Sequence, residues 1–204
     1  WATNYAGHFL VEARQEGYAI PEALLSSWIR YQQELANSWQ PHPDQGRHED
    51  LIQAYRLYTL ALAGNPALGA MNRMRENQNL TEASLWRLAA AYALSGKKQV
   101  ATGLIGNLDQ QVEDYDYDPY TYGSSLRDEA MILETLVLID QQPEGQTLLR
   151  SIANRLSQEK WLSTQTTAYS LLAISKYLGK DRADHTIRAT YNFNNEGVAE
   201  VNID

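Results

Sequence analysis

One stretch limits the fold more than any other: residues 161–179, which run from Trp161 to Gly179. Ser163 and Thr164 can cap the start of a helix, and a glycine such as Gly179 is typical just after a helix end. Between these ends, apolar side chains leave little of the helical circumference polar: Ala168, Leu171, Leu172, Ile174 and Leu178. We expect this helix to form an inner wall that is buried on more than one side, and this requires other helices around it.

Helical periodicity also runs through most of the remaining sequence. We expect N-caps at Asn65, Thr81 and Ser125, the last paired with Asp128 in a capping box. The predicted helices pair through short connections, at the spacing of helical-hairpin repeats. The fold class is therefore all-α, with antiparallel hairpins in two layers that form an incomplete α/α toroid. Besides 161–179, the predicted helices are 3–16, 21–35, 51–64, 66–76, 81–96, 97–111, 125–137 and 143–156.

The period changes near the end of the chain. Ile187, Ala189, Tyr191 and Phe193 alternate with polar residues, which is a strand pattern. Residues 194–197 suit a turn, and residues 198–203 suit a returning strand. We therefore expect a helical domain at 1–184 and the start of a β-sandwich domain at 185–204, as a short β-strand tail.

Composition excludes several classes of function. The net charge is −8, and no basic stripe is present to neutralise phosphates, so a nucleic-acid partner is not expected. No apolar run reaches the about 20 residues that span a bilayer, so we expect no membrane contact by this chain. Cysteine is absent, which removes disulfides, thiolate catalysis and cysteine-based zinc sites. Because the sequence begins at Trp1, we expect it to be a piece of a longer protein.

An acidic, tyrosine-rich segment at 113–123 invites two interpretations. Alternating carboxylates at Asp114, Asp116 and Asp118 are how an EF-hand calcium loop begins, but Pro119 replaces the glycine of its sixth position and the twelfth is a serine. A solvated acidic loop therefore explains them better. Its tyrosines indicate a contact surface, since tyrosine is enriched at protein interfaces. The predicted interface residues are Tyr117, Tyr120 and Tyr122.

Catalytic and cofactor motifs are absent from the sequence. His42 and His48 flank Asp44, but no His-Glu-x-x-His helix accompanies them, so a metal site is not expected. Helical toroids also host glycoside hydrolases, which need two carboxylates several ångströms apart, and the sequence does not show any two that converge. The carboxylates considered are Glu12, Glu82, Asp128, Glu129 and Glu134. We therefore predict no catalytic residue, no cofactor and no metal.

Three stretches together resemble the thioester-containing helical domain of the α2-macroglobulin and complement superfamily in its bacterial form. They are residues 5–25, with a helix–Gly–Tyr–x–x–Pro–helix pattern; residues 122–130, Tyr-Gly-Ser-Ser-Leu-Arg-Asp-Glu-Ala; and residues 161–174, with Ser-Thr-Gln at a helix start. Their order agrees with that of the family, and the strand tail lies where the family resumes its β-sandwich domains. Thr166 departs from the pattern, because many relatives carry an acidic residue there.

The resemblance implies part of a bacterial protease inhibitor that traps its target. In that family a protease cuts a bait region, and a thioester between a cysteine and a glutamine then captures it. Without cysteine this chain forms no thioester, so either the motif lies before Trp1 or the protein belongs to the relatives that lack it. In both cases the resemblance implies a structural part of the domain, not an enzyme. The implied partners are target proteases, through the full-length protein, and neighbouring β-sandwich domains. The implied location is the cell envelope, periplasmic or surface-exposed, with a lipid anchor outside this chain.

Two alternatives come from the residues alone. The chain could be a helical-repeat module that binds a protein through the tyrosine-rich segment, or a glycoside hydrolase built on an α/α toroid. A structure distinguishes them by the exposure of the tyrosines and by the separation of the carboxylates.

Overall fold

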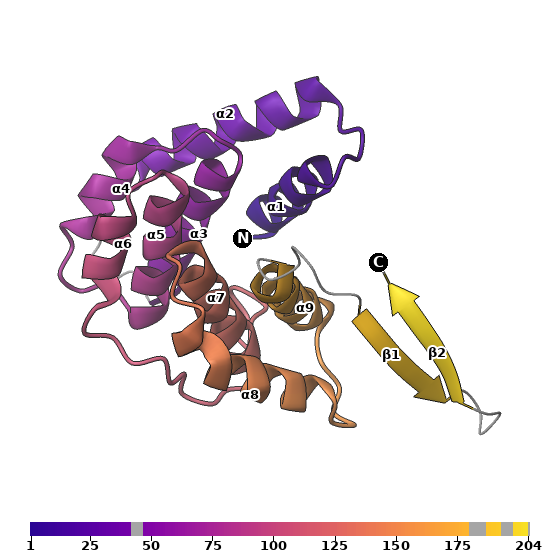
Figure 1. Cartoon of the computed structure of the whole chain (residues 1–204). Coiled ribbons are helices and arrows are strands. Elements are labelled where there is room, and N and C mark those ends of the chain that lie inside the picture. Colours follow the sequence, from indigo (N-terminus) through magenta and orange to yellow (C-terminus); the bar gives the residue numbers. More distant parts are fainter. Residues whose placement is uncertain (42–46, 180–186, 193–197, 204) are drawn as a thin grey trace.

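The chain folds into a layered set of helices followed by a β-hairpin, as a computed structural model shows (Figure 1). The structure describes residues 1–41, 47–179, 187–192 and 198–203. Its elements are α1 Ala2–Gln15, α2 Glu22–Ser38, α3 Arg47–Leu62, α4 Leu68–Arg75, α5 Glu82–Leu94, α6 Lys98–Ile105, α7 Ser125–Leu138, the 3₁₀ turn η1 Pro143–Gly145, α8 Gln146–Leu156, α9 Thr164–Gly179, β1 Ile187–Asn192 and β2 Val198–Ile203.

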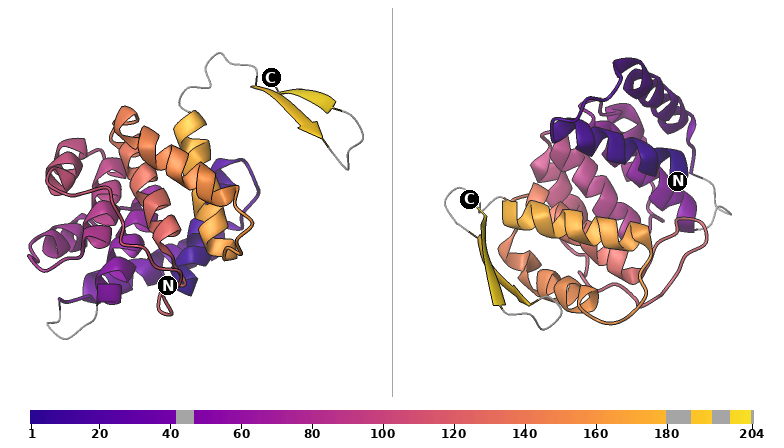
Figure 2. Two further views of the ribbon diagram at one scale, coloured as in Figure 1. Left: turned by 90° about the horizontal axis from the view of Figure 1, so that it is seen from below. Right: turned by 90° about the vertical axis from the view of Figure 1, so that its right-hand side faces the viewer.

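The helices form two layers. The odd-numbered helices α1, α3, α5, α7 and α9 follow one another along an arc, and each contacts the next. Helices α2, α4, α6 and α8 lie on the outer side of that arc (Figures 1 and 2). Among the described elements, α1 and α9 make no backbone contact with each other, although they end the arc on facing sides. The observed helices are consistent with the predicted all-α class.

The core lies between α3, α5 and α7. Helix α5 is buried around most of its circumference, and the alanines Ala89, Ala90 and Ala91 are fully buried within it. Their small side chains let α3 and α7 pack closely on opposite sides of α5. Helix α7 buries the predicted apolar positions Leu126, Ala130, Leu133 and Val137, but it also buries most of its other residues, so the burial does not single out one core face.

Helix starts were predicted with mixed success. The Thr81 hydroxyl accepts a hydrogen bond from the Ser84 amide at 3.3 Å, which confirms the N-cap of α5. The cap of α7 is Ser124 rather than Ser125, because the Ser124 hydroxyl accepts from the Arg127 amide at 3.3 Å. Helix α4 starts at Leu68, so the predicted cap at Asn65 is wrong. The Asn65 side chain donates instead to the Ala63 carbonyl at the end of α3.

Two predicted helices also differ from the structure. Helix α6 ends at Ile105, far short of residue 111, with Gly106 at its C-cap. In the segment that follows, the Asp109 carbonyl accepts a hydrogen bond from the Trp86 indole. Helix α9 is not buried on more than one side, since Leu171 is 57% exposed and Leu178 is 48% exposed. Its buried face is partly polar: Gln165, Thr166 and Ser170 lie there beside Tyr169 and Ala173.

The described end of the chain is a two-stranded antiparallel sheet. Strand β1 pairs with β2 in a register that sets Ile187 opposite Ile203 and Asn192 opposite Val198. The sequence placed strands at nearly the same residues; Phe193 and the predicted turn at 194–197 lie outside the described residues. Whether this hairpin opens a β-sandwich domain stays a prediction, as do the domain bounds 1–184 and 185–204.

Candidate functional site

The tyrosines of the predicted interface are on the surface. Tyr117, Tyr120 and Tyr122 are exposed by 58%, 63% and 52%, in the segment between α6 and α7. Tyr120 stacks on the His48 ring with 4.4 Å between centroids, and Tyr122 has a φ of +53°, which is uncommon for a bulky residue. The structure thus displays all three side chains, and their role as an interface stays a prediction.

The three alternating aspartates of this segment do not converge. Asp114 accepts from the Ser125 hydroxyl, Asp116 pairs with Lys160, and Asp118 accepts from the Thr121 hydroxyl at 2.6 Å. Separate partners on different elements hold the carboxylates apart, so a calcium loop is not formed. Across the part of the chain that the structure describes, no group of three or more His, Asp or Glu side chains could hold a metal ion.

A buried arginine instead organises this segment. Arg127 is fully buried; its Nε donates to Asp128 at 2.7 Å, and its Nη2 donates to the Thr121 hydroxyl at 3.1 Å. The Tyr115 hydroxyl donates to the other Asp128 oxygen at 2.6 Å. Burial raises the pKa of Tyr115, and the Asp128 charge adds to this effect, so Tyr115 remains a donor. Arg127 therefore ties the 113–123 segment to the start of α7.

The first residue of the chain completes this cluster. The Trp1 indole stacks on Tyr55 with 4.5 Å between ring centroids, and the Arg127 guanidinium lies 4.9 Å from the Trp1 ring. With its amide oriented to match its neighbours, Gln165 accepts from the Trp1 Nε1 at 2.7 Å and donates to the Thr121 carbonyl. Helices α3, α7 and α9 and the tyrosine-rich segment therefore meet at Trp1.

A second buried cluster surrounds Glu134 on α7. Glu134 Oε2 accepts from Arg87 at 2.7 Å, and Oε1 accepts from Tyr58 at 2.6 Å and from Lys176 at 2.7 Å. Lys176 also pairs with Glu12 at 2.5 Å. We call these residues the Glu134 cluster; together they join α1, α3, α5, α7 and α9.

Electrostatics fix the charges in this cluster. Burial by itself would raise the pKa of Glu134, but the charges of Lys176 and Arg87 hold that pKa well below its usual range. Burial likewise opposes the charge on Lys176, yet the carboxylate of Glu134 raises the pKa of Lys176 above its ordinary value. Both groups stay ionised around neutral pH.

His8 extends the cluster toward the α1 side. Its Nε2 lies 3.2 Å from Glu12 and its Nδ1 lies 3.0 Å from the Tyr55 hydroxyl. Because a carboxylate only accepts, the proton belongs on Nε2, and Nδ1 accepts from Tyr55. Burial lowers the pKa of His8 despite its hydrogen bond to Glu12, so the ring is neutral at pH 7.

Two of the carboxylates considered for glycoside hydrolysis do meet, since Glu12 and Glu134 contact the same Lys176 ammonium. Glu134 is 2% exposed and accepts three hydrogen bonds, and its lowered pKa prevents it from acting as a general acid. The other three lie elsewhere. Glu82 is exposed at the start of α5, Asp128 pairs with Arg127, and Glu129 pairs with Arg155. The geometry supports a structural pair rather than a hydrolytic one.

The sequence did not predict the roles of Arg87 and Lys176. Each is an isolated polar residue in an apolar helical stretch, which by itself indicates an exposed position. Their partner Glu134 is 47 residues from Arg87 and 42 residues from Lys176 along the chain. The one available signal was that Arg87 stands among alanines and leucines on a helix with few other polar positions.

Comparison with known proteins decides the family. The chain is 30% identical over 188 residues to the α2-macroglobulin of Escherichia coli strain K12. This chain is homologous to bacterial α2-macroglobulin. The match covers 85% of the chain and 11% of that protein, so the chain corresponds to about a tenth of its length. No family model matches the chain.

Solved structures of E. coli α2-macroglobulin contain a region with a fold similar to that of this chain. The native E. coli protein, spanning domain MG7 to the C-terminus, has a TM-score of 0.72 at 24% identity, over 100% of this chain and 34% of that one. The trypsin-activated E. coli protein has a TM-score of 0.69 at 24% identity, over 100% of this chain and 14% of that one. At 24% identity, these two similarities concern the fold of this chain alone.

Proposed function

We propose that this chain is a structural part of the thioester domain of a bacterial α2-macroglobulin-like protease trap, without chemistry of its own. The observation that carries the proposal is the homology to E. coli α2-macroglobulin over 85% of the chain. The chain has no cysteine, so any thioester would be formed by residues outside it. Its contribution is then to hold neighbouring segments in place until a protease cleaves the trap.

The buried charges suit this role. The Glu134 cluster joins five helices of the inner layer. A second cluster around Arg127 joins α7 to the tyrosine-rich segment through Thr121 and, through the neighbouring contact of Ser124 with Thr166, to α9. A buried pair that loses one partner leaves an uncompensated charge, so both clusters favour one arrangement of the helices. A helical body in which the carboxylates considered for catalysis form no accessible pair fits a scaffold better than a catalyst.

The incomplete toroid belongs to the same proposal. Phe9 on α1, which is 69% exposed, lines an apolar groove of about 190 Å³, and Leu171 on α9 is also 57% exposed. Residues of both helices line that groove, including Tyr5, Ala168 and Leu172. Side chains of α1 and α9 already meet at Lys176 and Glu12, so we place further segments of the full-length protein over the exposed side of this groove, and the β-sandwich that follows would begin at β1.

The proposal extends to partners and location. The partners are target proteases, met through the full-length protein, and the compartment is the cell envelope, as for an extracytoplasmic trap. None of the helices within the described ranges is long and apolar enough to cross a bilayer. A lipid anchor, if the full-length protein uses one, belongs to a segment outside this chain.

The experiment uses the full-length protein and trypsin. After mixing, trypsin activity is measured on a small chromogenic peptide and on casein. A trap leaves the small substrate accessible and blocks the large one, so the casein activity should fall much further than the peptide activity. If the same fraction of trypsin activity remains on both substrates, at every ratio of protein to trypsin, the proposal is contradicted.

A second candidate function is that the tyrosine-rich segment serves as an independent binding surface. The exposure of its tyrosines is the observation that favours this function.

A further inference from the structure

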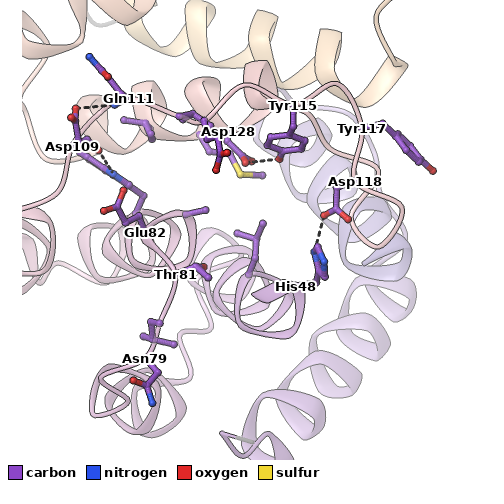
Figure 3. Close-up of a pocket in the computed structure, with 18 of the residues that line it drawn as sticks. His48, Asn79, Thr81, Glu82, Asp109, Gln111, Tyr115, Tyr117, Asp118 and Asp128 are labelled. Carbon is purple, nitrogen blue, oxygen red and sulfur yellow. Dashed lines mark hydrogen bonds and ion pairs between the residues drawn. The ribbon is translucent and has the colours of Figure 1, made fainter. Parts of the chain in front are cut away.

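A hollow of about 740 Å³ lies where α3, α5 and α7 begin, under the segment that follows α6 (Figure 3). Its volume falls in the range of ligand sites, about 300–1,000 Å³. Apolar side chains from all four elements line it: Leu51, Leu80, Trp86, Val112, Met131 and Ile132. The Trp86 indole donates to the Asp109 carbonyl at 3.2 Å and so holds the segment over the hollow.

The rim of this hollow is acidic. Glu82, Asp109 and Glu113 line it as exposed residues, and neither Glu82 nor Glu113 has a described ion-pair partner. Figure 3 shows Glu82 and Asp109 on one side and His48 with Asp118 on the other. Glu82 lies in the first turn of α5.

Positive charge is scarce around the hollow. Among the described residues that line it there is no lysine or arginine, and the histidine there, His48, already contacts Asp118 at 3.1 Å. The carboxylates deeper in the wall are also occupied, since Asp118 accepts from Thr121 and Asp128 accepts from Tyr115 and Arg127. The carboxylates without a described ion-pair partner, Glu82 and Glu113, therefore give the mouth of the hollow a negative charge.

We propose that the hollow docks a basic peptide segment of another protein. A lysine or arginine suits it because the aliphatic stem packs on apolar surface while the charged head stays near water and carboxylates. Neighbouring apolar residues of the peptide would enter between Leu80 and Val112, and the basic heads would lie beside Glu82 and Glu113. This inference rests on the hollow alone and is independent of the role in protease trapping.

The test uses the 204-residue chain, labelled with ¹⁵N, and a capped peptide, Gly-Leu-Lys-Leu-Lys-Gly. A matched peptide carries glutamate in place of both lysines. Titrations at low salt follow the indole Nε1–H signal of Trp86, assigned with Trp86→Phe, and calorimetry gives the affinity. We expect the basic peptide to shift this signal and the acidic peptide to leave it unchanged.

Variants locate the binding. Removing both rim charges in Glu82→Gln/Glu113→Gln should weaken binding about fivefold, the effect of two exposed ion pairs. Filling the hollow with Ala83→Trp should weaken it about tenfold or more, with circular dichroism to check the fold. The control Glu16→Gln/Glu159→Gln removes two exposed carboxylates that do not line the hollow and should stay within twofold.

Three results would overturn the proposal. The first is no binding of the basic peptide, and the second is equal affinity in the rim, filled and control variants. The third is binding of spermine as tight as that of the peptide, because the hollow would then select a small polycation rather than a peptide segment.

Discussion

Lys176 and Glu134 lie 2.7 Å apart between α9 and α7, and Lys176 also reaches Glu12 on α1. Because α1 and α9 make no backbone contact within the described elements, this ammonium is a direct charged link between the two ends of the inner layer. We therefore expect the stability of the whole helical body to depend on a few buried charges.

Glu134→Gln tests this dependence. The substitution removes the carboxylate that pairs with Arg87 and leaves Lys176 with Glu12 alone, so the free energy of unfolding should fall by about 3–5 kcal/mol, as when one partner of a buried pair is removed. Urea denaturation followed by circular dichroism measures the change. The exposed control Glu159→Gln should change the value by less than about 0.5 kcal/mol. In a double-mutant cycle with Lys176→Gln, simple additivity would show that the two side chains are not coupled.

Two glycines should respond to alanine in opposite directions. A Cβ on Gly7 would lie 1.9 Å from the Trp28 indole, which packs on α1 and donates to the Thr3 carbonyl. Gly7→Ala should therefore destabilise the α1–α2 hairpin by about 1–3 kcal/mol. Gly103 in α6 has no atom within 4 Å of an added Cβ, so Gly103→Ala should stabilise the chain by about 0.5–1 kcal/mol. Thermal unfolding of both variants gives the signs, and a stable Gly7→Ala protein would contradict the packing described here.

His8 should make stability depend on pH below neutrality. Its folded pKa is lowered by burial, whereas a histidine in the unfolded chain titrates near about 6.5. Below that pH the unfolded chain binds a proton that the folded chain does not, so stability is full above about pH 6.5 and falls as the pH falls, by up to about 1.4 kcal/mol per unit. Glu134 and Lys176 do not contribute in this window, because their pKa values are displaced away from it.

Urea midpoints between pH 7.5 and 5.5 measure this slope. His8→Gln should flatten it, whereas His48→Gln, on a side chain that is 40% exposed, should retain it. An unchanged slope in His8→Gln would show that some other group is responsible.

Arg127→Met should loosen the tyrosine-rich segment without unfolding the core. Two backbone hydrogen bonds report on this segment: the Asp118 amide to the Gly123 carbonyl at 2.9 Å, and the Ser125 amide to the Tyr115 carbonyl at 3.0 Å. Without the guanidinium, hydrogen exchange at these two amides should become at least about tenfold faster, since local opening then costs less free energy. Exchange in α3 serves as the internal control. An equal acceleration there would mean that the whole body, rather than the segment, has been destabilised.

Sequence alone predicted the parts of the fold that depend on local pattern. Thr81 was correctly chosen as the cap of α5, and the apolar positions chosen on α7 are buried, as are most other residues of that helix. The choice between Ser124 and Ser125 failed because adjacent serines offer the same hydroxyl. Tertiary contacts distinguish them, since Ser124 contacts Thr166 on α9 and Ser125 donates to Asp114.

The buried charges could not be predicted in this way. A glutamate such as Glu134 in an apolar helix reads as a residue on the solvent face, and its burial depends on partners from three other helices. The same applies to α9, whose apolar composition suggested a fully buried wall. Its polar residues Gln165 and Thr166 face the interior because they form hydrogen bonds there, Gln165 with Trp1 and Thr166 with Ser124. Leu171 faces outward.

The most direct test of the scaffold role is the retention of trypsin by the full-length protein carrying Glu134→Gln, compared with wild type and Glu159→Gln. Retention is measured by size exclusion after mixing, and the folded fraction of the isolated chain is measured at the same temperature. We predict that wild type and Glu159→Gln retain trypsin, and that retention by Glu134→Gln falls together with its folded fraction. A Glu134→Gln protein that retains trypsin in full while the isolated chain is unfolded would contradict the scaffold role.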